Sequence, residues 1–599
     1  MGFPRGEGAA PRTRRPSSFR HKTLTIDDAN ERMNLNLLLV TVAVPVVAAL
    51  LIWVMSDASE WALRRVRLVA LAGSVLALLL AIATMVRHDR LLVAHNGDLA
   101  ALYGSGLSWL SPDATGIDIR FSLGLDGLSF WLFGLTALLM VTAVLISWDA
   151  IRDGAAAYYA LLLLLESGMF GVFLARDIVL FYIFFEFTLI PLFFLIGIWG
   201  SDRRRYAAMK FFLYTFAGSV LTFLGLLALV VWNFYHAGNG VLTFYIPQLQ
   251  AGLTAAPVAL SVPYVNQDLG LLIFLALFAG FAIKVPLFPL HTWLPLAHVE
   301  APAAGSVLLA GVMLKIGVYG FLRFNISMLP AAAAVCMPWI LALSVAGIIY
   351  GALVALAQSD IKRLIAYSSV SHLGFCMVGL FAFNRAAVEG GTLQMISHGL
   401  STGGLFALVG MLYERYHTRE IRQLGGLAAR TPWLAVLMGF FALSSLGLPG
   451  LNGFPGEFML LLGMFQRSWV APPPEWATLY KTLSVLSVFG VVLGAWYLLW
   501  MVKRVFFGPL KEPARHGEPI RDLSLREIGA LAPLVVVVIW IGVYPGFFFS
   551  RMAADVDPIA DVASAWLEAS YRPDHAELAA GEVRQPSHLA RKNEALRDH

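Results

Sequence analysis

Acidic and basic side chains stand inside long apolar stretches of this sequence. The acids are Glu186 in YIFFEFTLIPLFF and Glu457 in GFPGEFML, and the bases are Lys284 in FAGFAIKVPLF and Lys315 in LLAGVMLKIGVYGF. A charge at the centre of a membrane helix costs roughly 2.5–3.5 kcal/mol on insertion scales, so such residues are functional candidates by default. We expect all four to carry chemistry.

Three histidines accompany these charges: His291 after the segment that holds Lys284, His372 in SSVSHLGFCM and His398 in TLQMISHGLSTGG. A lysine keeps a facing carboxylate charged, whereas desolvation favours the neutral form of both groups, so a small change nearby can move a proton. Histidine titrates near neutral pH and can relay that proton. The set predicts transfer of protons or of another cation, with His291 and His372 included among the residues that carry it.

Other interpretations of the polar residues have less support in the sequence. Glu166, in LLLLLESGMFGVF, fits a structural hydrogen bond as well as a role in transport, and His372 also fits a satisfied buried histidine. Two histidines on facing helices can ligate haem, but here the histidines accompany lysines and glutamates. The sequence has no GxGxxG, P-loop or CxxC pattern, and its two cysteines exclude a disulfide framework and a four-cysteine metal site.

The elements that hold these residues are membrane helices. Of 599 residues, 58% are hydrophobic and 14% are charged, against about 25% charged in soluble domains. A span needs about 20 apolar residues. We predict an all-α polytopic membrane protein with about fourteen spans, near 35–55, 67–86, 128–147, 157–175, 178–199, 207–233, 269–290, 303–323, 337–357, 364–383, 392–413, 433–464, 482–502 and 528–550.

The middle of the chain is predicted to contain two inverted five-helix repeats, a common plan in transporters. The fourth helix of each repeat is interrupted, by Pro286 and Pro289 after Lys284 and by PGLNGFPG before Glu457. Broken backbone at membrane depth is tolerated where protein or a water-filled cavity satisfies it. The expected divisions are a basic N-terminal extension (1–32), helices 1–3 (33–156), repeat 1 (157–323), repeat 2 (337–502), a final helix (528–550) and a polar tail with a short amphipathic piece (551–599).

Charge in the loops predicts the orientation. Arginine and lysine gather in alternate loops, such as 203–205 and 415–430, whereas the loop 236–268 contains neither. The positive-inside rule then places both ends of the fourteen-span core on the outer side. The basic residues of 1–32 disagree with that placement, and Met33 begins a natural-looking start, so we expect the extension to be disordered or not translated.

Two long motifs carry a resemblance. The stretches KVPLFPLHTWLPLAHVEAPAAGSVLLAGVMLKIGVYGFLRF (284–324) and QSDIKRLIAYSSVSHLGF (358–375) resemble the antiporter-like subunits of respiratory complex I, and the likeness covers roughly 33–550. Within that family, a glutamate on the second broken helix is typical of the chain M type, whose mitochondrial counterpart is NADH dehydrogenase subunit 4. The family often has an acidic residue where this chain has Leu296, which lies outside the expected relay.

The resemblance implies a role for each candidate residue. Glu186 would pair with Lys284, Lys315 would form a central relay with His291 and His398, and Glu457 would lie on the exit side. The chain would bind no cofactor or metal, while NADH, FMN, iron–sulfur clusters and quinone would lie in partner subunits. Its neighbours would be the antiporter-like chains L and N, in a bacterial inner membrane.

The predicted function is proton translocation in a membrane-bound NADH:quinone oxidoreductase, by a subunit without redox chemistry. A subunit of a multi-subunit Na⁺/H⁺ antiporter is the alternative, because both families share broken helices and buried lysines. A stand-alone channel fits less well, since charged pairs along a path favour protons over hydrated ions.

Overall fold

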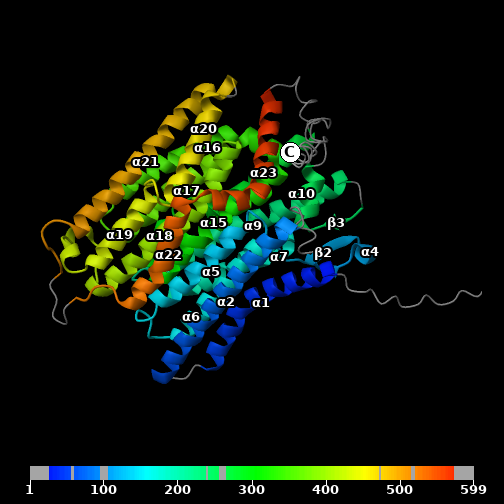
Figure 1. Cartoon of the computed structure of the whole chain (residues 1–599). Helices are drawn as coiled ribbons and strands as arrows, with labels where there is room; N and C mark the ends of the chain where they lie inside the picture. Colours follow the sequence, from blue (N-terminus) through cyan, green and yellow to red (C-terminus); the bar gives the residue numbers. More distant parts are fainter. Residues whose placement is uncertain are drawn as a thin grey trace, which may run out of the picture.

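The structure is a computed structural model that describes residues 26–55, 60–94, 106–237, 240–254, 265–470, 474–513 and 520–571. Most of it is one bundle of long helices that run side by side, with α1 and α2 at one edge and α19–α21 at the opposite edge (Figure 1). The expectations for 1–25 and for the tail beyond 571 fall outside the described residues.

Helices of the first half of the chain cross the bundle in the order that the apolar runs predict. Pro286, Pro289 and Pro449 lie at the two predicted interruptions, whereas Pro45 and Pro338 lie inside continuous helices. The helices are α1 (Ile26–Val54), α2 (Glu60–Ala94), α5 (Phe130–Ile146), α6 (Ala155–Leu174), α7 (Ile178–Phe187), α8 (Leu189–Trp199), α9 (Arg204–Ala237), α12 (Val265–Lys284), α13 (Leu294–Glu300), α14 (Ala303–Leu308) and α15 (Leu314–Gly320).

The second half of the chain also consists of long helices that follow its apolar runs. Two π-helical turns, η1 (Leu309–Met313) and η2 (Phe321–Ile326), flank α15 in the last span of the first half. The later helices are α16 (Pro330–Leu356), α17 (Ile361–Phe381), α18 (Arg385–Tyr416), α19 (Pro432–Ser445), α20 (Gly453–Trp469), α21 (Ala477–Phe506), α22 (Leu525–Val543) and α23 (Gly546–Tyr571), with short 3₁₀ turns η3 (Ile421–Gln423), η4 (Leu427–Ala429) and η5 (Pro474–Trp476).

The prediction of an all-α polytopic membrane protein is confirmed. Among the described residues, 11 helices are long and apolar enough to cross a membrane. The three remaining predicted spans are also helical: α5 is shorter, α12 ends at Lys284, and the run 433–464 is divided into α19 and α20. Both predicted interruptions are therefore present at corresponding places in the two groups of five.

A small sheet covers one end of the bundle. Strand β1 (Leu107–Leu110) pairs antiparallel with β2 (Ile117–Phe121), which pairs in parallel with β3 (Leu242–Thr243). The turn α4 (Pro112–Thr115) joins the first two strands, and α10 (Ile246–Thr254) follows the third. These short elements lie within stretches that the hydropathy reading treats as loops.

The C-terminal part of the chain is more helical than a short amphipathic piece. The last apolar helix, α22, ends at Val543, and α23 then extends to Tyr571. One face of α23 is buried every three or four residues, and this face packs on the core. Its buried apolar residues are Phe548, Met552, Val556, Ile559, Ala560, Ala563 and Leu567.

Candidate functional site

The second broken helix is held to its neighbour by Asn452, the last residue of the break. Its side-chain Nδ2 donates to the carbonyl of Ser397 at 2.9 Å, and Ser397 Oγ donates to the backbone oxygen of Asn452 at 2.7 Å. Asn452 Oδ1 accepts hydrogen bonds from Ser401 and Ser444 at 3.2 and 2.5 Å. Side chains of α18 and α19 thus supply partners that the interrupted helix lacks, as buried backbone requires.

Glu457 lies one turn inside α20 and is buried. Its Oε1 accepts a hydrogen bond from Nε2 of Gln394 on α18 at 2.8 Å. The same oxygen lies 3.4 Å from Nδ1 of His372 on α17. The carboxylate therefore has an amide donor on one side and a titratable base on the other.

Lys315 and His398 meet because two backbones approach closely. A Cβ on Gly399 would lie 2.7 Å from the carbonyl oxygen of Gly311, so α18 and η1 tolerate only glycine at this crossing. Lys315 follows Gly311 by four residues, and its Nζ lies 2.7 Å from Nδ1 of His398. Nζ also donates to the carbonyl of Ala310, in the π-helical turn η1.

His372 lies between these two groups. Its ring centroid is 5.7 Å from that of His398, and its Nδ1 faces Glu457. Lys315, His398, His372 and Glu457 thus form a line of neighbouring groups through four helical elements, η1–α15, α18, α17 and α20. All four are at most 5% exposed, so the line is shielded from water by packed side chains.

In the first repeat, Lys284 is the last residue of α12 and is buried. Its Nζ lies 4.2 Å from the ring centroid of Phe185, the residue before Glu186 on α7. Glu186 is the acid that acts electrostatically on Lys284. Among the described residues, Lys284 Nζ and Glu186 Oε1 have no hydrogen-bond partner, so the two groups are neighbours without a direct ion pair.

The break after Lys284 also has a partner for its backbone. The indole N–H of Trp293 donates to the carbonyl of Ile283 at 2.9 Å, so one exposed helix end is satisfied. His291 lies in this segment but not against the line described above. Its ring packs on Phe288 and Tyr350.

Asp177 begins the helix that carries Glu186. Its Oδ1 accepts from the backbone N–H of Val179 and Leu180 at 2.9 and 3.4 Å, and its Oδ2 from that of Arg120 on β2 at 3.0 Å. Burial raises the pKa of this carboxyl to about 6, although the three N–H donors act in the opposite direction. Asp177 therefore fixes α7 to the small sheet.

Three polar residues beside the site were not predicted from the sequence, because the prediction relied on charged residues within apolar runs. Gln394 is neutral, and Lys362 follows a polar segment that reads as a loop. His298, in LPLAHVE, lies on α13, fully buried and stacked 4.5 Å from Phe406, and both Lys362 and Lys315 act on it electrostatically. Lys362 Nζ donates to the carbonyl of Ala301 at 2.5 Å. His298 could have been predicted from its position, because it is an ionisable residue one helical turn beyond a helix break.

Comparison with known proteins shows the family to which this chain belongs. The family model described as "NADH:quinone oxidoreductase/Mrp antiporter, TM" matches residues 175–473. The chain is 40% identical over 524 residues to NADH-quinone oxidoreductase subunit M of Rhodobacter capsulatus, which covers 85% of this chain and 93% of that protein. The chain belongs to the subunit M family of NADH-quinone oxidoreductases.

Other relatives agree with this family. NADH-ubiquinone oxidoreductase chain 4 of Arabidopsis thaliana is 38% identical over 495 residues, with 82% of this chain and 91% of that one covered. A chain of respiratory complex I from Thermus thermophilus with bound NADH matches with a TM-score of 0.71 and 32% identity, over 88% of this chain and 99% of that one.

A chain of the Mrp complex from Dietzia sp. DQ12-45-1b matches with a TM-score of 0.69 but 21% identity, over 89% of this chain and 99% of that one, so it shares the fold. The antiporter alternative is the more distant of the two. The chain is thus a multi-pass membrane protein of the complex I subunit M type, as the sequence motifs predicted.

Proposed function

We propose that this chain moves protons across the membrane within a membrane-bound NADH:quinone oxidoreductase, and that electrons move only in other subunits. The observation that carries the proposal is the buried line from Lys315 through His398 and His372 to Glu457. A base, two imidazoles and a carboxylate in sequence are groups that can each take and release a proton.

Lys284 and Glu186 would control the loading of this line. With the Lys284 ammonium against Phe185 and close to Glu186, a shift of charge at Glu186 changes how strongly the lysine holds its proton. Lys315, in the next span, would receive the proton because His298 and His398 lie within its electrostatic reach. Glu457 would release it on the other side.

The assembly around this chain is part of the same proposal. Antiporter-like chains L and N would be its neighbours, in a bacterial inner membrane, with the ends of the fourteen-span core outside. NADH, FMN, iron–sulfur clusters and quinone would belong to partner subunits.

Proton uptake driven by NADH in inverted membrane vesicles tests the proposal. We expect Lys315→Ala, Lys284→Ala, Glu186→Gln and Glu457→Ala to reduce the rate on the order of tenfold or more, since general acid–base groups contribute at least that much. Quinone reduction should fall with it because pumping and electron transfer are coupled. Lys284→Arg should be milder, because the charge survives although arginine does not readily release its proton.

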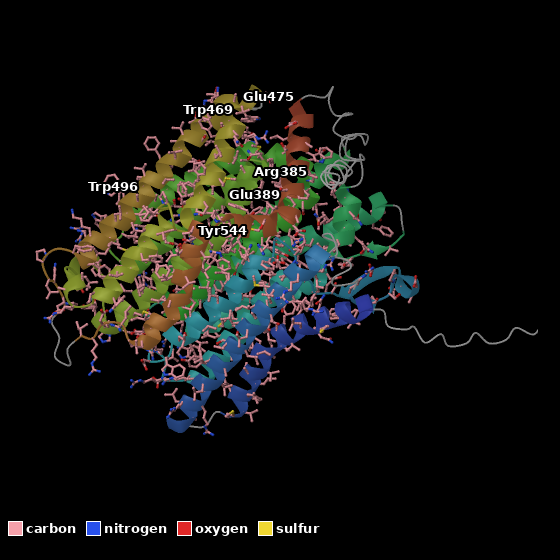
Figure 2. The ribbon with its side chains drawn as sticks, in the orientation of Figure 1. Arg385, Glu389, Trp469, Glu475, Trp496 and Tyr544 are labelled. Atoms are coloured by element: carbon pink, nitrogen blue, oxygen red, sulfur yellow. The ribbon has the colours of Figure 1, made fainter. Side chains whose placement is uncertain are left out.

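Matched controls are available on exposed positions. Lys481→Ala and Glu475→Gln remove the same charges from the surface, where Figure 2 labels Glu475, and should pump at the wild-type rate. Native gels separate failed assembly from failed pumping. Normal pumping by the assembled Lys284→Ala and Glu186→Gln variants would show that this pair is structural. Normal pumping by Lys315→Ala would show that the proposed proton path is wrong.

The shared fold with an Mrp complex supplies one further arm of the experiment. The same vesicles should pump equally in potassium and sodium media. Proton movement that requires sodium and proceeds without NADH would favour the antiporter function instead.

A further inference from the structure

Lys362 is a buried lysine that lies outside the line of relay groups. It is the second residue of α17 and is 5% exposed, whereas Arg363, the next residue, is exposed. The start of a helix disfavours a cation, and a buried ammonium needs hydrogen-bond acceptors in place of water. The position of Lys362 therefore asks for partners outside its own helix.

The first repeat supplies these partners where α13 ends. Lys362 Nζ donates to the carbonyl of Ala301 at 2.5 Å and lies 3.5 Å from the carbonyl oxygen of Val299. Arg419 donates to the same carbonyl of Val299 at 3.0 Å. The last carbonyls of a helix have no partner within it, so the two cations satisfy them. Lys362 thus ties the segment after the first helix break to the second repeat.

Two carboxylates also surround this end of the break. Asp360 forms an ion pair with Arg419 at 3.4 Å, and Glu300 accepts the backbone N–H of Arg203 at 3.0 Å. Asp360 and Glu300 act on Lys362 in favour of its ammonium form, while burial and Arg419 act against it. The carbonyls and carboxylates together compensate the ammonium for the water that it has lost.

His298 lies between Lys362 and the relay. Its ring is fully buried and stacks 4.5 Å from Phe406, and neither ring nitrogen has a hydrogen-bond partner among the described residues. Lys362 and Lys315 both act on this imidazole electrostatically. A proton on His298 would therefore be a buried charge that no hydrogen bond stabilises and that two ammonium groups repel.

We propose that Lys362 is a positioning residue that closes the direct path from Lys315 to the basic loops. Its ammonium keeps His298 neutral, so a proton on Lys315 moves on to His398 and does not return through His298. Electrostatic barriers made by fixed cations exclude protons from membrane pores in the same way. The inference rests on the proposed function of the relay and adds the group that makes its transport one-way.

Passive proton flow through the assembled, inhibited complex tests this role. Purified complex in liposomes receives a quinone-site inhibitor, and a potassium diffusion potential set by valinomycin then drives protons across the membrane. Lys362→Gln keeps a donor for the Ala301 carbonyl and removes the charge, so proton flow should be on the order of tenfold faster than in the wild type. Without the inhibitor, quinone reduction should continue while fewer protons are taken up per NADH.

Two other substitutions separate the charge of Lys362 from its hydrogen bond. Lys362→Met removes both the charge and the donor and should leak as much as Lys362→Gln, whereas Lys362→Arg keeps the charge and should stay close to the wild type. Arg419→Gln is the matched control. It removes a neighbouring cation from the Val299 carbonyl, whereas the cations that act on His298 are Lys362 and Lys315, so its proton flow should be unchanged.

A double variant tests whether the leak passes through His298. His298→Phe keeps the ring that stacks on Phe406 and removes both nitrogens. Combined with Lys362→Gln, it should return the passive proton flow to about the wild-type rate, because the group that accepts the returning proton is absent.

The outcomes separate this inference from the function on which it rests. Wild-type flow through assembled Lys362→Gln would overturn the inference, and so would equal leaks in Lys362→Gln and Arg419→Gln, which indicate loosened packing. A leak that persists in the double variant would also overturn it. If Lys362→Gln does not assemble, Lys362→Met and Lys362→Arg provide the comparison of an uncharged with a charged side chain. The proposed function fails by a different result, which is normal pumping by Lys315→Ala.

Discussion

The two carboxylate oxygens of Glu457 have different surroundings at membrane depth. Oε1 accepts from Gln394 and faces His372. Oε2 occupies the space above Gly447, where a Cβ would lie only 2.5 Å from it. A buried charge without such partners costs several kcal/mol, so the glycine is part of the carboxylate's environment.

Gly447→Ala should therefore displace the carboxylate. Gly447 has φ of 75°, and any side chain there also strains the backbone, by about 1 kcal/mol. We expect assembled complex with this variant to lose NADH-driven proton uptake on the order of tenfold. The matched control is Gly450→Ala, where φ is 90° but the added Cβ meets nothing within 4 Å. Equal rates in the two variants would contradict a role for Gly447 beyond the turn.

The charged members of the site could be predicted from the sequence because they stand out in apolar runs. The structure brings Lys315, His398, His372 and Glu457 together and leaves His291 apart. Gln394 could not be predicted, since neutral polar residues are common in membrane helices. Its importance depends on which helix packs against which, and a single sequence does not contain that information.

Helix α7 depends on its first turn for position. The Asp177 carboxyl accepts hydrogen bonds from three backbone N–H groups and joins α7 to β2. Burial nevertheless raises its pKa from the ordinary value of 3.8 to about 6. The folded protein then holds this proton at pH values where the unfolded chain has released it. Asp177 lowers the free energy of unfolding as pH rises from about 4 to about 6, and the effect is constant above that window.

Asp177→Asn should remove this dependence while keeping an oxygen that caps the helix. A pKa displaced from 3.8 to about 6 corresponds to about 3 kcal/mol, so the variant should gain stability relative to the wild type as pH rises. Thermal unfolding of the purified protein in detergent, at pH 4.5, 6 and 7, measures the difference. A constant difference across these values would show that Asp177 titrates normally.

The positions of the helices could be predicted where the apolar runs are uninterrupted. The helix breaks could be predicted where prolines and glycines cluster. The sheet β1–β2–β3 could not be predicted, because its strands have two to five residues and no alternating pattern of useful length. The length of α23 could not be predicted either. Its many polar residues are typical of a polar tail, and only the structure shows that its apolar residues pack on the core.

The two halves of the molecule are joined by α23. Asp555 accepts the backbone N–H of Gly127 at 2.6 Å, Arg551 donates to Asp89 of α2 at 2.8 Å, and Trp131 of α5 donates to the carbonyl of Phe548 at 3.2 Å. Arg385, near the start of α18, forms an ion pair with Asp561, and it lies beside α23 in Figure 2. The C-terminal helix thus spans from the first helices to the second repeat.

The orientation of the whole molecule can be settled on one helix. Helix α9 has 34 residues, about 50 Å at 1.5 Å per residue, which exceeds the roughly 30 Å apolar core of a membrane. Asp202, just before α9, and Ala251 on α10, just after it in the chain, are both exposed and must lie on opposite sides. The positive-inside rule places the arginines at 203–205 in the cytoplasm and Ala251 outside.

Single cysteines at these two positions decide between the orientations. Cys336 and Cys376, the two native cysteines, are first replaced by serine and alanine. An impermeant thiol reagent should then label Ala251→Cys in intact cells and Asp202→Cys only after permeabilisation, because the reagent reaches one side of the membrane. The reverse pattern would place the basic loops outside. Glu457, on α20, whose last turn contains Arg467 near the predicted outer face, would then take protons up instead of releasing them.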